Sequence, residues 1–356
     1  MADSITKTGT AGFDTSVNAA LGKFDRPINM IIEEETNLCK QKSQFDKLLY
    51  TVAPSTKFAE AYFMEDELGL LSAVDEGGMA EAMLSKERRK HYVEHTEFKG
   101  DCIINKTLIE DSNRSEIDKR VRKLIRSYWA TRNKFAQEGI INGTSDSMTF
   151  AGKSFELKTS DGKALFAKDH IYGDSGDQSN YFHCVESSWD SSAIAELLTA
   201  LAVKGRQMMS ENGDPMGYSF NKIIIPGNCF KLEKAVREVV GTQYSPGNNN
   251  NNINILHGGW QIIVLPNWTI TSGATPSLMI MSDEANEALG GSMFYDRKPF
   301  EVEKQNQFDR NDNLFIHGRA RMSLVHNTYK HILRCDLRTA DYEADATPPS
   351  TELDLG

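Results

Sequence analysis

A long amphipathic helix is the feature of this sequence that most restricts its fold. Apolar residues recur at helical spacing for about 25 residues after Asn113, an N-cap residue type with Glu116 at capping-box spacing. The stripe consists of Ile117, Val121, Leu124, Ile125, Tyr128 and Trp129, and Gly139 is the expected stop. We therefore predict one helix over residues 113–138, roughly 37 Å long at 1.5 Å per residue.

Two segments before this helix cannot bury enough surface to be stable alone. Residues 1–58 are polar and interrupted by glycine and proline, so we expect an extended arm with a helical piece around Ile31–Lys47. Residues 59–105 predict a long hairpin, because Ala59–Met64 and His91–Phe98 are rich in strand-favouring residues. Both segments need contacts with another part of the molecule or with a neighbouring copy.

A compact α/β unit is predicted over residues 191–300. Helices are expected at Ser192–Met209 and Asn228–Val240. Alternating apolar residues over 299–336 indicate antiparallel strands, and an acidic tail follows. The short apolar runs that suit buried strands are Ile223–Ile225, Ile262–Leu265 and Leu278–Met281.

Composition excludes several classes of protein. The 50 acidic residues exceed the 40 basic ones, giving a net charge of −10, so bulk charge does not favour strong nucleic-acid binding. The sequence has no apolar stretch of about 18 residues, so we predict no membrane span. The first residues lack the pattern of a secretory signal. Five cysteines without a CxxC pair argue against a disulfide framework or a zinc ribbon and favour a reducing cytosol as the place of synthesis.

One motif suggests an enzyme. His91, Glu94 and His95 match the H-x-x-E-H pattern of a zinc-dependent hydrolase, which requires a helix. Their neighbours favour a strand, where residues four apart are separated by roughly 13 Å. One zinc ion binds imidazole nitrogens at only about 2 Å. An exposed strand is therefore the favoured interpretation, with the zinc hydrolase as the alternative.

Other catalytic patterns are weak. Asp169 and His170 could act as an acid–base pair, but no nucleophile motif accompanies them, and a turn before a short strand explains them better. His183 and Cys184 form an adjacent pair that suits a packed interior. The sequence contains neither a Walker A motif nor G-x-G-x-x-G. We therefore expect no catalytic residue, no metal and no cofactor.

Basic residues crowd the long helix. In the simpler interpretation, they form a solvated face opposite the apolar stripe. In the functional interpretation, they attract an anionic partner such as packaged nucleic acid, weakly and in a salt-sensitive way. Both interpretations stay open at this point. The basic residues are Arg114, Lys119, Arg120, Arg122, Lys123, Arg126, Arg132 and Lys134.

Three stretches carry a family resemblance. They are Ile103–Asp111, Asp161–Phe166 followed by His170, and Asn221–Pro226 with the later Gly258–Val264. With the order of arm, hairpin, long helix, α/β unit and final strands, they resemble major capsid proteins of tailed bacteriophages with the Hong Kong 97 fold, in particular the Mu-type major head subunit group. The resemblance covers about residues 59–336. One departure is Ala167–Asp169, where that family typically has Ser or Thr before the histidine.

The resemblance implies an α+β capsid fold in which the long helix is the spine helix of a peripheral domain. The arm and the hairpin of such subunits lie across neighbours, and the axial domains meet at capsomer centres. The implied division is an N-terminal arm (1–58), an extended hairpin loop (59–105), a peripheral domain (106–190 and 301–343), an axial domain (191–300) and a flexible tail (344–356).

The implied function is that of a major capsid protein, without catalysis, which forms hexamers and pentamers of an icosahedral shell around phage DNA. Its place would be the virion, assembled in the host bacterial cytoplasm, with no membrane. Scaffold, portal and decoration proteins are possible further partners, and an encapsulin-like cellular compartment shell is the close alternative. The implied subunit-interface residues at the hairpin tip are Glu76, Gly77, Gly78, Lys86, Arg88 and Arg89, and the lumen-facing or DNA-facing candidates are Lys119, Arg122, Lys123 and Arg126.

Overall fold

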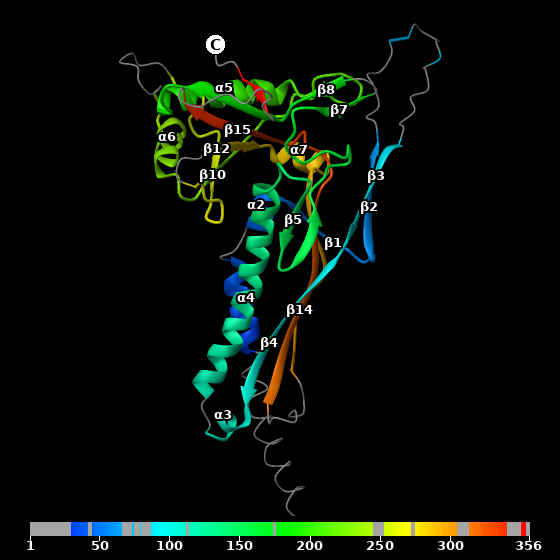
Figure 1. Ribbon diagram of the computed structural model, residues 1–356, viewed down its shortest axis with the longest axis vertical. Helices are drawn as coiled ribbons and strands as arrows, with labels where there is room; N and C mark the ends of the chain where they lie inside the picture. The colour runs from blue at the N-terminus through cyan, green and yellow to red at the C-terminus, as the bar shows by residue number, and fades with distance from the viewer. Residues whose placement is uncertain are drawn as a thin grey trace, which may run out of the picture. The chain divides into compact units, whose positions relative to one another are not determined.

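The computed structural model divides the chain into two compact units (Figure 1). A helix–sheet unit comprises residues 1–44, 95–133 and 296–322, and an α/β unit comprises residues 45–94, 134–295 and 323–356. The structure describes residues 30–41, 45–65, 73–74, 79, 87–111, 114–173, 176–244, 253–271, 275–304, 313–339 and 350–353.

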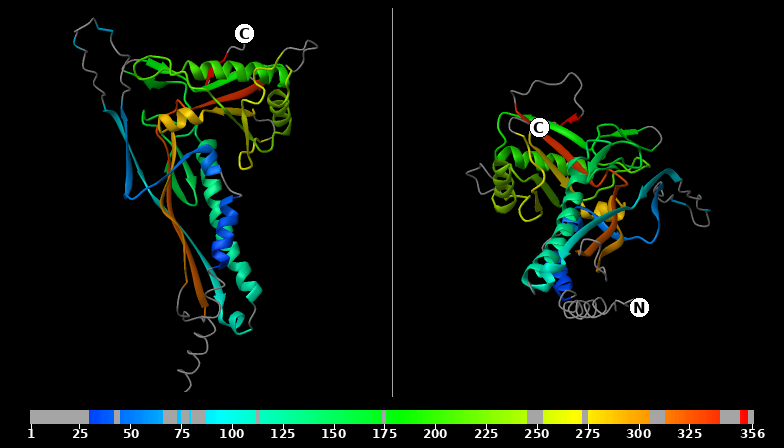
Figure 2. Two further views of the ribbon diagram at one scale, coloured as in Figure 1. Left: turned by 180° about the vertical axis from the view of Figure 1, so that it is seen from behind. Right: turned by 60° about the horizontal axis from the view of Figure 1, so that its bottom comes forward.

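The helix–sheet unit is built on the predicted long helix. Helix α4 (Arg114–Ile141) contributes its first turns to this unit, and the short helix α3 (Lys106–Glu110) precedes it. The helical stretch 30–41 lies along α4 in both views of Figure 2. The prediction of a helical piece within the N-terminal arm is therefore confirmed for these residues.

A four-stranded sheet packs its apolar side chains against α4. Strand β4 (Thr96–Asn105) pairs antiparallel with β14 (Asn313–His326), so that Ile104 lies opposite Leu314. Every second residue of β14 is buried from Leu314 to Met322, which is the pattern of a strand with one covered face. The sheet order is β1 (Thr51–Pro54), β13 (Ser292–Lys304), β14, β4. Buried residues of this core include Ile31, Ile104, Ile117, Val121, Ile125, Leu314 and Ile316.

The long helix extends past its predicted end. We expected Gly139 to stop it, but α4 continues to Ile141. Gly139 is required by packing instead, because a Cβ atom there would clash with the Tyr50 hydroxyl and lie 2.9 Å from the Leu324 side chain. The glycine thus lets the last turns of α4 approach neighbouring segments of the α/β unit closely.

A six-stranded mixed sheet forms the centre of the α/β unit. The three predicted apolar runs are its strands β10, β11 and β12, as expected. The sheet also takes in strands from outside residues 191–300, which the sequence pattern did not reveal. Its order is β11 (Gln261–Leu265), β10 (Lys222–Pro226), β12 (Ser277–Met281), β15 (Ile332–Thr339), β9 (Tyr181–Glu186) and β16 (Thr351–Glu352).

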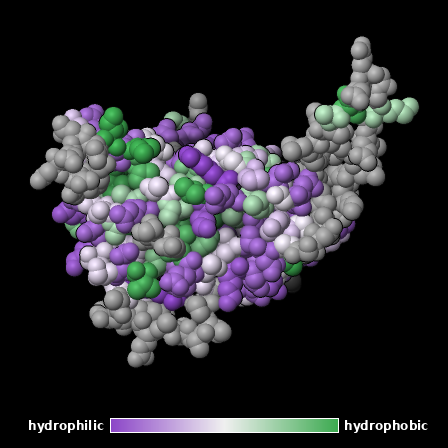
Figure 3. Space-filling model, turned by 90° about the horizontal axis from the view of Figure 1, so that it is seen from above, coloured by the Kyte–Doolittle hydropathy of each residue, from purple (hydrophilic) through white to green (hydrophobic). Residues whose placement is uncertain are grey.

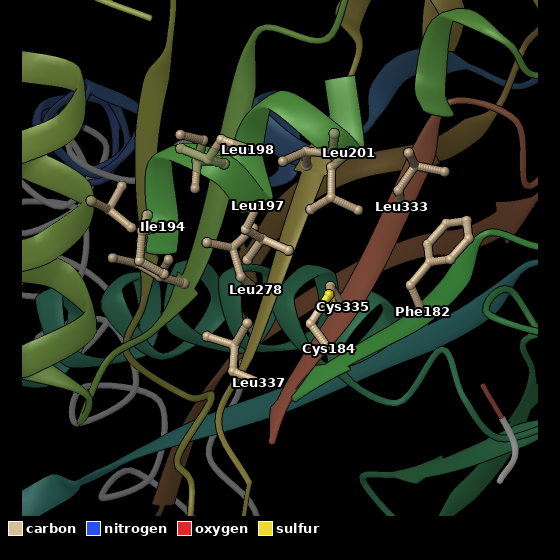
Figure 4. Packing of buried hydrophobic residues seen from close by; sticks show 14 of the residues in the cluster. Phe182, Cys184, Ile194, Leu197, Leu198, Leu201, Leu278, Leu333, Cys335 and Leu337 are labelled. Carbon is tan, nitrogen blue, oxygen red and sulfur yellow. The ribbon is translucent and has the colours of Figure 1, made fainter. Parts of the chain in front are cut away.

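Helices α5 (Ser191–Arg206) and α6 (Phe230–Gly241) cover one face of this sheet. Asp190 caps α5 by accepting hydrogen bonds from the backbone N–H groups of Ser192 and Ala193. The predicted end at Met209 was three residues too late. Figure 4 shows the core beneath α5, where leucines from the helix meet Phe182, Leu278, Leu333 and the two buried cysteines.

Three two-stranded ribbons and two short helices complete the described fold. No helix in the described part of the chain is long and apolar enough to cross a membrane. The ribbons are β2 (Ala59–Glu65) with β3 (Glu87–Glu94), β5 (Ser147–Phe150) with β6 (Lys153–Glu156), and β7 (His170–Tyr172) with β8 (Gly176–Gln178); the helices are α2 (Phe45–Leu49) and α7 (Asp283–Ala288).

Candidate functional site

The β2–β3 ribbon is the structural counterpart of the predicted hairpin, but it ends at Glu94. The prediction was wrong for residues 96–105, which form β4 and pair with β14 in the four-stranded sheet. The two strands of the ribbon pair antiparallel from Ala59 opposite Glu94 to Met64 opposite Arg89, with an irregularity before Glu65. Within the described residues, no third strand extends either edge of the ribbon. A two-stranded ribbon of this kind gains little stability by itself.

The hairpin-tip candidates fall mostly beyond this ribbon. Arg88 and Arg89 lie on the backbone of β3. Their expected role at a subunit interface stays a prediction. The other four tip candidates, Glu76, Gly77, Gly78 and Lys86, lie outside the described residues.

The base of the ribbon is anchored to the α/β unit. Tyr62 donates a hydrogen bond of 2.8 Å from its hydroxyl to the carbonyl oxygen of Leu289. Two aromatic side chains near the same end, Phe58 and Tyr92, are exposed over more than half of their surface. The Lys90 ammonium lies 4.7 Å from the centre of the Tyr92 ring. The ribbon therefore combines a fixed base with exposed aromatic surface.

The H-x-x-E-H motif lies on a strand, as the sequence predicts. His91 and Glu94 belong to β3, and His95 follows it directly. Burial lowers the pKa of His91. No group of three or more histidine, cysteine or carboxylate side chains in the described part of the chain is arranged to hold a metal ion.

A carboxylate from the arm occupies part of the basic face of α4. Glu35, which is only 2% exposed, accepts hydrogen bonds from Arg122 at 2.6 Å and from Arg126 at 2.5 Å. Glu34 accepts a second bond from Arg122 at 2.9 Å. The hydrogen bond from Arg126 is the main reason that the pKa of Glu35 is lowered, and the bonds to Glu35 raise the pKa of both arginines. We call this set of four residues the arm clasp.

The arm clasp changes the basic face that the sequence predicts. Arg122 and Arg126 already have carboxylate partners, whereas Lys119 and Lys123 are exposed. The Lys119 ammonium lies 3.8 Å from the Glu116 carboxylate, on the same helix. Arg132 does not belong to a solvated face, because it is buried and donates two hydrogen bonds to the Asp296 carboxylate. Only part of the basic stripe is thus available to an outside anion.

The stretch around Asp161, which carries part of the family resemblance, folds into a closed loop rather than an acid–base site. His170 is fully buried and its Nδ1 lies 2.6 Å from Asp161 Oδ2, while its Nε2 lies 3.2 Å from the Leu165 carbonyl oxygen. Interactions with His170 lower the pKa of Asp161 to about 2 against the opposing effect of burial. The neighbour Asp169, considered above as the partner of His170, pairs instead with Lys163 at 2.5 Å.

This loop is fixed to the sheet from several sides. The Tyr329 ring stacks on the His170 ring with centroids 3.7 Å apart. The Asn180 side-chain amide donates to the carbonyl oxygens of Leu165, Tyr329 and Ile332. Buried polar groups that are this fully paired hold a backbone in one conformation. The stretch therefore has a structural role in the α/β unit.

A cleft of about 810 Å³ lies at the start of α6. Trp189, Phe230 and Leu337 line it together with Cys229, whose thiol pKa is raised by burial. None of the described residues that line the cleft is a histidine, aspartate or glutamate, and its titratable residues are Cys229 and Lys231.

Exposed apolar side chains gather on loops of the α/β unit. Tyr244 and Ile253 form an isolated bridge between two loop segments, and both are exposed, as is Ile255 at 94%. On the face drawn in Figure 3, hydrophobic groups gather in one area and hydrophilic groups border it. Grouped apolar exposure of this kind is typical of surfaces that contact another protein.

Comparison with known proteins identifies the fold. No protein-family model matches the sequence, and no curated protein is significantly similar to it. Among solved structures, the capsid of Myoviridae phage XM1 matches with a TM-score of 0.51 and 9% identity, over 82% of this chain and 91% of that chain. The chain therefore has the α+β Hong Kong 97 capsid fold that the sequence resemblance implies.

Two further matches have TM-scores below 0.5 and add no argument. One is from Mycobacterium phage Patience, with a TM-score of 0.49 and 13% identity over 94% of this chain and 91% of that chain. The other is the SrpI encapsulin of Synechococcus elongatus, with a TM-score of 0.48 and 10% identity over 85% of this chain and 89% of that chain. Neither singles out the Mu-type group, so that part of the resemblance stays a prediction.

Proposed function

We propose, from its Hong Kong 97 capsid fold, that this chain is the major capsid protein of a tailed phage. It would assemble into hexamers and pentamers of an icosahedral shell around phage DNA. The observation that carries the proposal, besides the fold, is that the β2–β3 ribbon has only two strands in the described part of the chain. A ribbon that cannot be stable alone needs a partner surface, and repeated contacts between identical copies close into a shell.

The exposed surfaces support contacts between copies. Strand edges can take up backbone hydrogen bonds from a neighbour, and exposed aromatic rings such as Phe58 and Tyr92 supply apolar contact area. The apolar loop residues Ile253 and Ile255 offer a second contact surface on the α/β unit. We assign the division into arm, hairpin, peripheral domain, axial domain and tail to this proposal, with one correction. Residues 350–353 of the expected flexible tail are docked, because β16 pairs with β9 and Leu353 is buried.

We propose that the basic face of α4 lies toward the shell lumen and contacts DNA through the residues that are not part of the arm clasp. Lys119 and Lys123 are its exposed members. Such contacts are weak and fall with salt, because they exchange phosphate counterions for a few ammonium groups. The proposed place is the virion, after assembly in the bacterial cytoplasm, with scaffold, portal and decoration proteins as further partners.

A structural role without catalysis is part of the proposal. The candidate acid–base residue His170 is fully buried and already paired with Asp161. The candidate zinc ligands lie on and beside a strand, which is the wrong geometry for one metal ion. Both features support a building block over an enzyme.

The first test is negative-stain electron microscopy with light scattering on the purified full chain. Hollow shells, or rings of five or six subunits, are the expected result. If only monomers form, coexpression with candidate scaffold proteins is the second arm, and a chain that stays monomeric there contradicts the proposal. Nucleic acid inside purified particles supports a phage head, whereas a protein cargo indicates a cellular compartment shell of the encapsulin kind.

A further inference from the structure

The C-terminal segment 350–353 is docked on the edge of the six-stranded sheet. Its strand β16 pairs parallel with β9, with Thr351 opposite Phe182 and Glu352 opposite His183. Strand β16 is thus only two residues long. Residues 340–349, which separate it from β15, lie outside the described part of the chain. The segment contacts the unit as a short peptide does.

One apolar side chain anchors the segment. Leu353 is 4% exposed and belongs to the main core of the α/β unit, together with Phe182, Cys184 and Leu337. The wall that it meets is formed by residues of β9 and β15, and these strands pair with each other from Arg334 opposite Tyr181 to Thr339 opposite Glu186. Figure 4 shows that Cys184 and Leu337 belong to this shared core. The slot for a leucine is therefore built without the segment itself.

Polar contacts fix the register of the docked segment. The Ser350 hydroxyl, which is buried, lies 3.0 Å from Nδ1 of His183. The Leu353 amide donates to the His183 carbonyl oxygen at 2.9 Å, and the Cys184 thiol donates to the Leu353 carbonyl oxygen at 3.5 Å. Thr351 and Glu352 between them are exposed. Recognition thus rests on a serine, a leucine three residues later and the backbone between them.

We propose that the sheet edge formed by β9 is a peptide-docking site. Its ligand is an extended segment with serine and leucine three residues apart, and its occupant is the chain's own Ser350–Leu353. Strand addition to a sheet edge with one pocket for a side chain is a general mode of peptide recognition. Because β9 is already held in the sheet by its pairing with β15, this edge holds the segment without a covalent link to the chain. The inference does not depend on shell formation.

The test cuts the link in the folded full chain. A site for a specific protease is inserted between Asp345 and Ala346, and an unchanged urea midpoint of the uncut protein shows that the insertion leaves the fold intact. After cleavage, we expect the C-terminal fragment to stay bound at high protein concentration. We also expect excess fluorescent peptide with the sequence of Ser350–Gly356 to replace it saturably, as measured by anisotropy.

Two peptide variants separate specific docking from loose adhesion. Leu353→Ala is expected to weaken binding about 30-fold, since it removes most of a buried leucine side chain. Glu352→Ala is the matched control at an exposed position and should bind like the parent peptide. In the uncut chain, L353A should also speed amide exchange at Cys184, while E352A should not.

Three outcomes would overturn the proposal. The first is that the cleaved fragment dissociates and the labelled peptide does not bind, although the protein keeps its urea midpoint. The second is that no excess of peptide displaces the fragment, which would show that the segment is an integral strand of the sheet. The third is that the Leu353→Ala and Glu352→Ala peptides bind equally.

Discussion

At the scale of single residues, buried polar groups decide the local structure of this chain. His326 and His331 are fully buried, and their ring nitrogens lie 2.8 and 2.7 Å from the Ser292 hydroxyl. Burial lowers the pKa of His326 to about 4 and that of His331 to about 3. His91 adds a small effect on His326 in the same direction, and the Tyr50 ring lies 5.7 Å from the His326 ring. Both histidines are thus held neutral.

The neutral histidines predict a loss of stability in mild acid. Between pH 6.5 and about 4, the unfolded chain binds protons at these side chains while the folded chain does not, so stability falls as the pH falls. Above pH 6.5 the neutral form prevails in both states and the contribution is complete. We expect the urea midpoint to decrease steadily from pH 7 to 4.5.

A matched pair of variants checks the source of this slope. His326→Gln should reduce the pH dependence, because one of the groups that resist protonation is gone. Gln261→Asn, at an exposed position without a titratable group, should leave the slope as it is. His91 and His183 also have lowered pKa values, so the slope should shrink and not vanish. An unchanged slope in His326→Gln would show that this histidine takes up its proton in the folded state as readily as in the unfolded chain.

The arm clasp predicts a local effect on the arm helix. Glu35→Gln keeps the shape of the side chain but removes the charge shared by Arg122 and Arg126. Because both arginines reach solvent, we discount the effect for screening and expect a loss of about 1–2 kcal/mol. Hydrogen exchange over residues 30–41 should rise. Glu33→Gln, on the exposed side of the same helical stretch, is the control, and equal exchange in both variants would argue against the clasp.

At the scale of elements, the sequence predicted what depends on local pattern. The long helix, the three buried strands and the strand nature of His91–Glu94 follow from periodicity and residue type, which the structure confirms. What it could not predict depends on contacts between distant residues. Glu35 and Arg122 are 87 residues apart, and β9 joins β15 across 151 residues at Cys184 and Cys335. No spacing rule links such positions.

Gly139 gives a prediction about the end of α4. Alanine normally stabilises a helix by about 1 kcal/mol relative to glycine. Here its Cβ would meet Tyr50 and Leu324, both buried, so we expect Gly139→Ala to destabilise by about 1–3 kcal/mol. Gly241→Ala at the end of α6, where a Cβ meets nothing within 4 Å, is the control and should be neutral or stabilising. Urea unfolding of the two variants measures the difference, and a gain in both would contradict the packing argument.

At the scale of the whole molecule, the hairpin should matter for assembly and not for folding. The candidate site is only partly visible in the sequence, because an assembly surface consists of exposed residues without a chemical motif. We predict that deleting Glu65–Arg89 leaves the α/β core folded, since the main cluster of this core is built from described residues 182–353, all outside the deleted segment. Shell formation, observed by electron microscopy, should be lost. Normal shells from the deletion variant would remove the hairpin from the assembly mechanism.

The discontinuity of the helix–sheet unit has a consequence for synthesis on the ribosome. Residues 296–322 are the last of its three segments in chain order, so its sheet lacks β14 until those residues have been made. The arm helix, made first, waits for its docking surface on α4, and the closing strand β14 arrives long after both. A nascent chain therefore has no complete helix–sheet unit to offer a neighbouring subunit. On the proposed function, contacts of this unit with a neighbouring subunit therefore have to wait until β14 has been made.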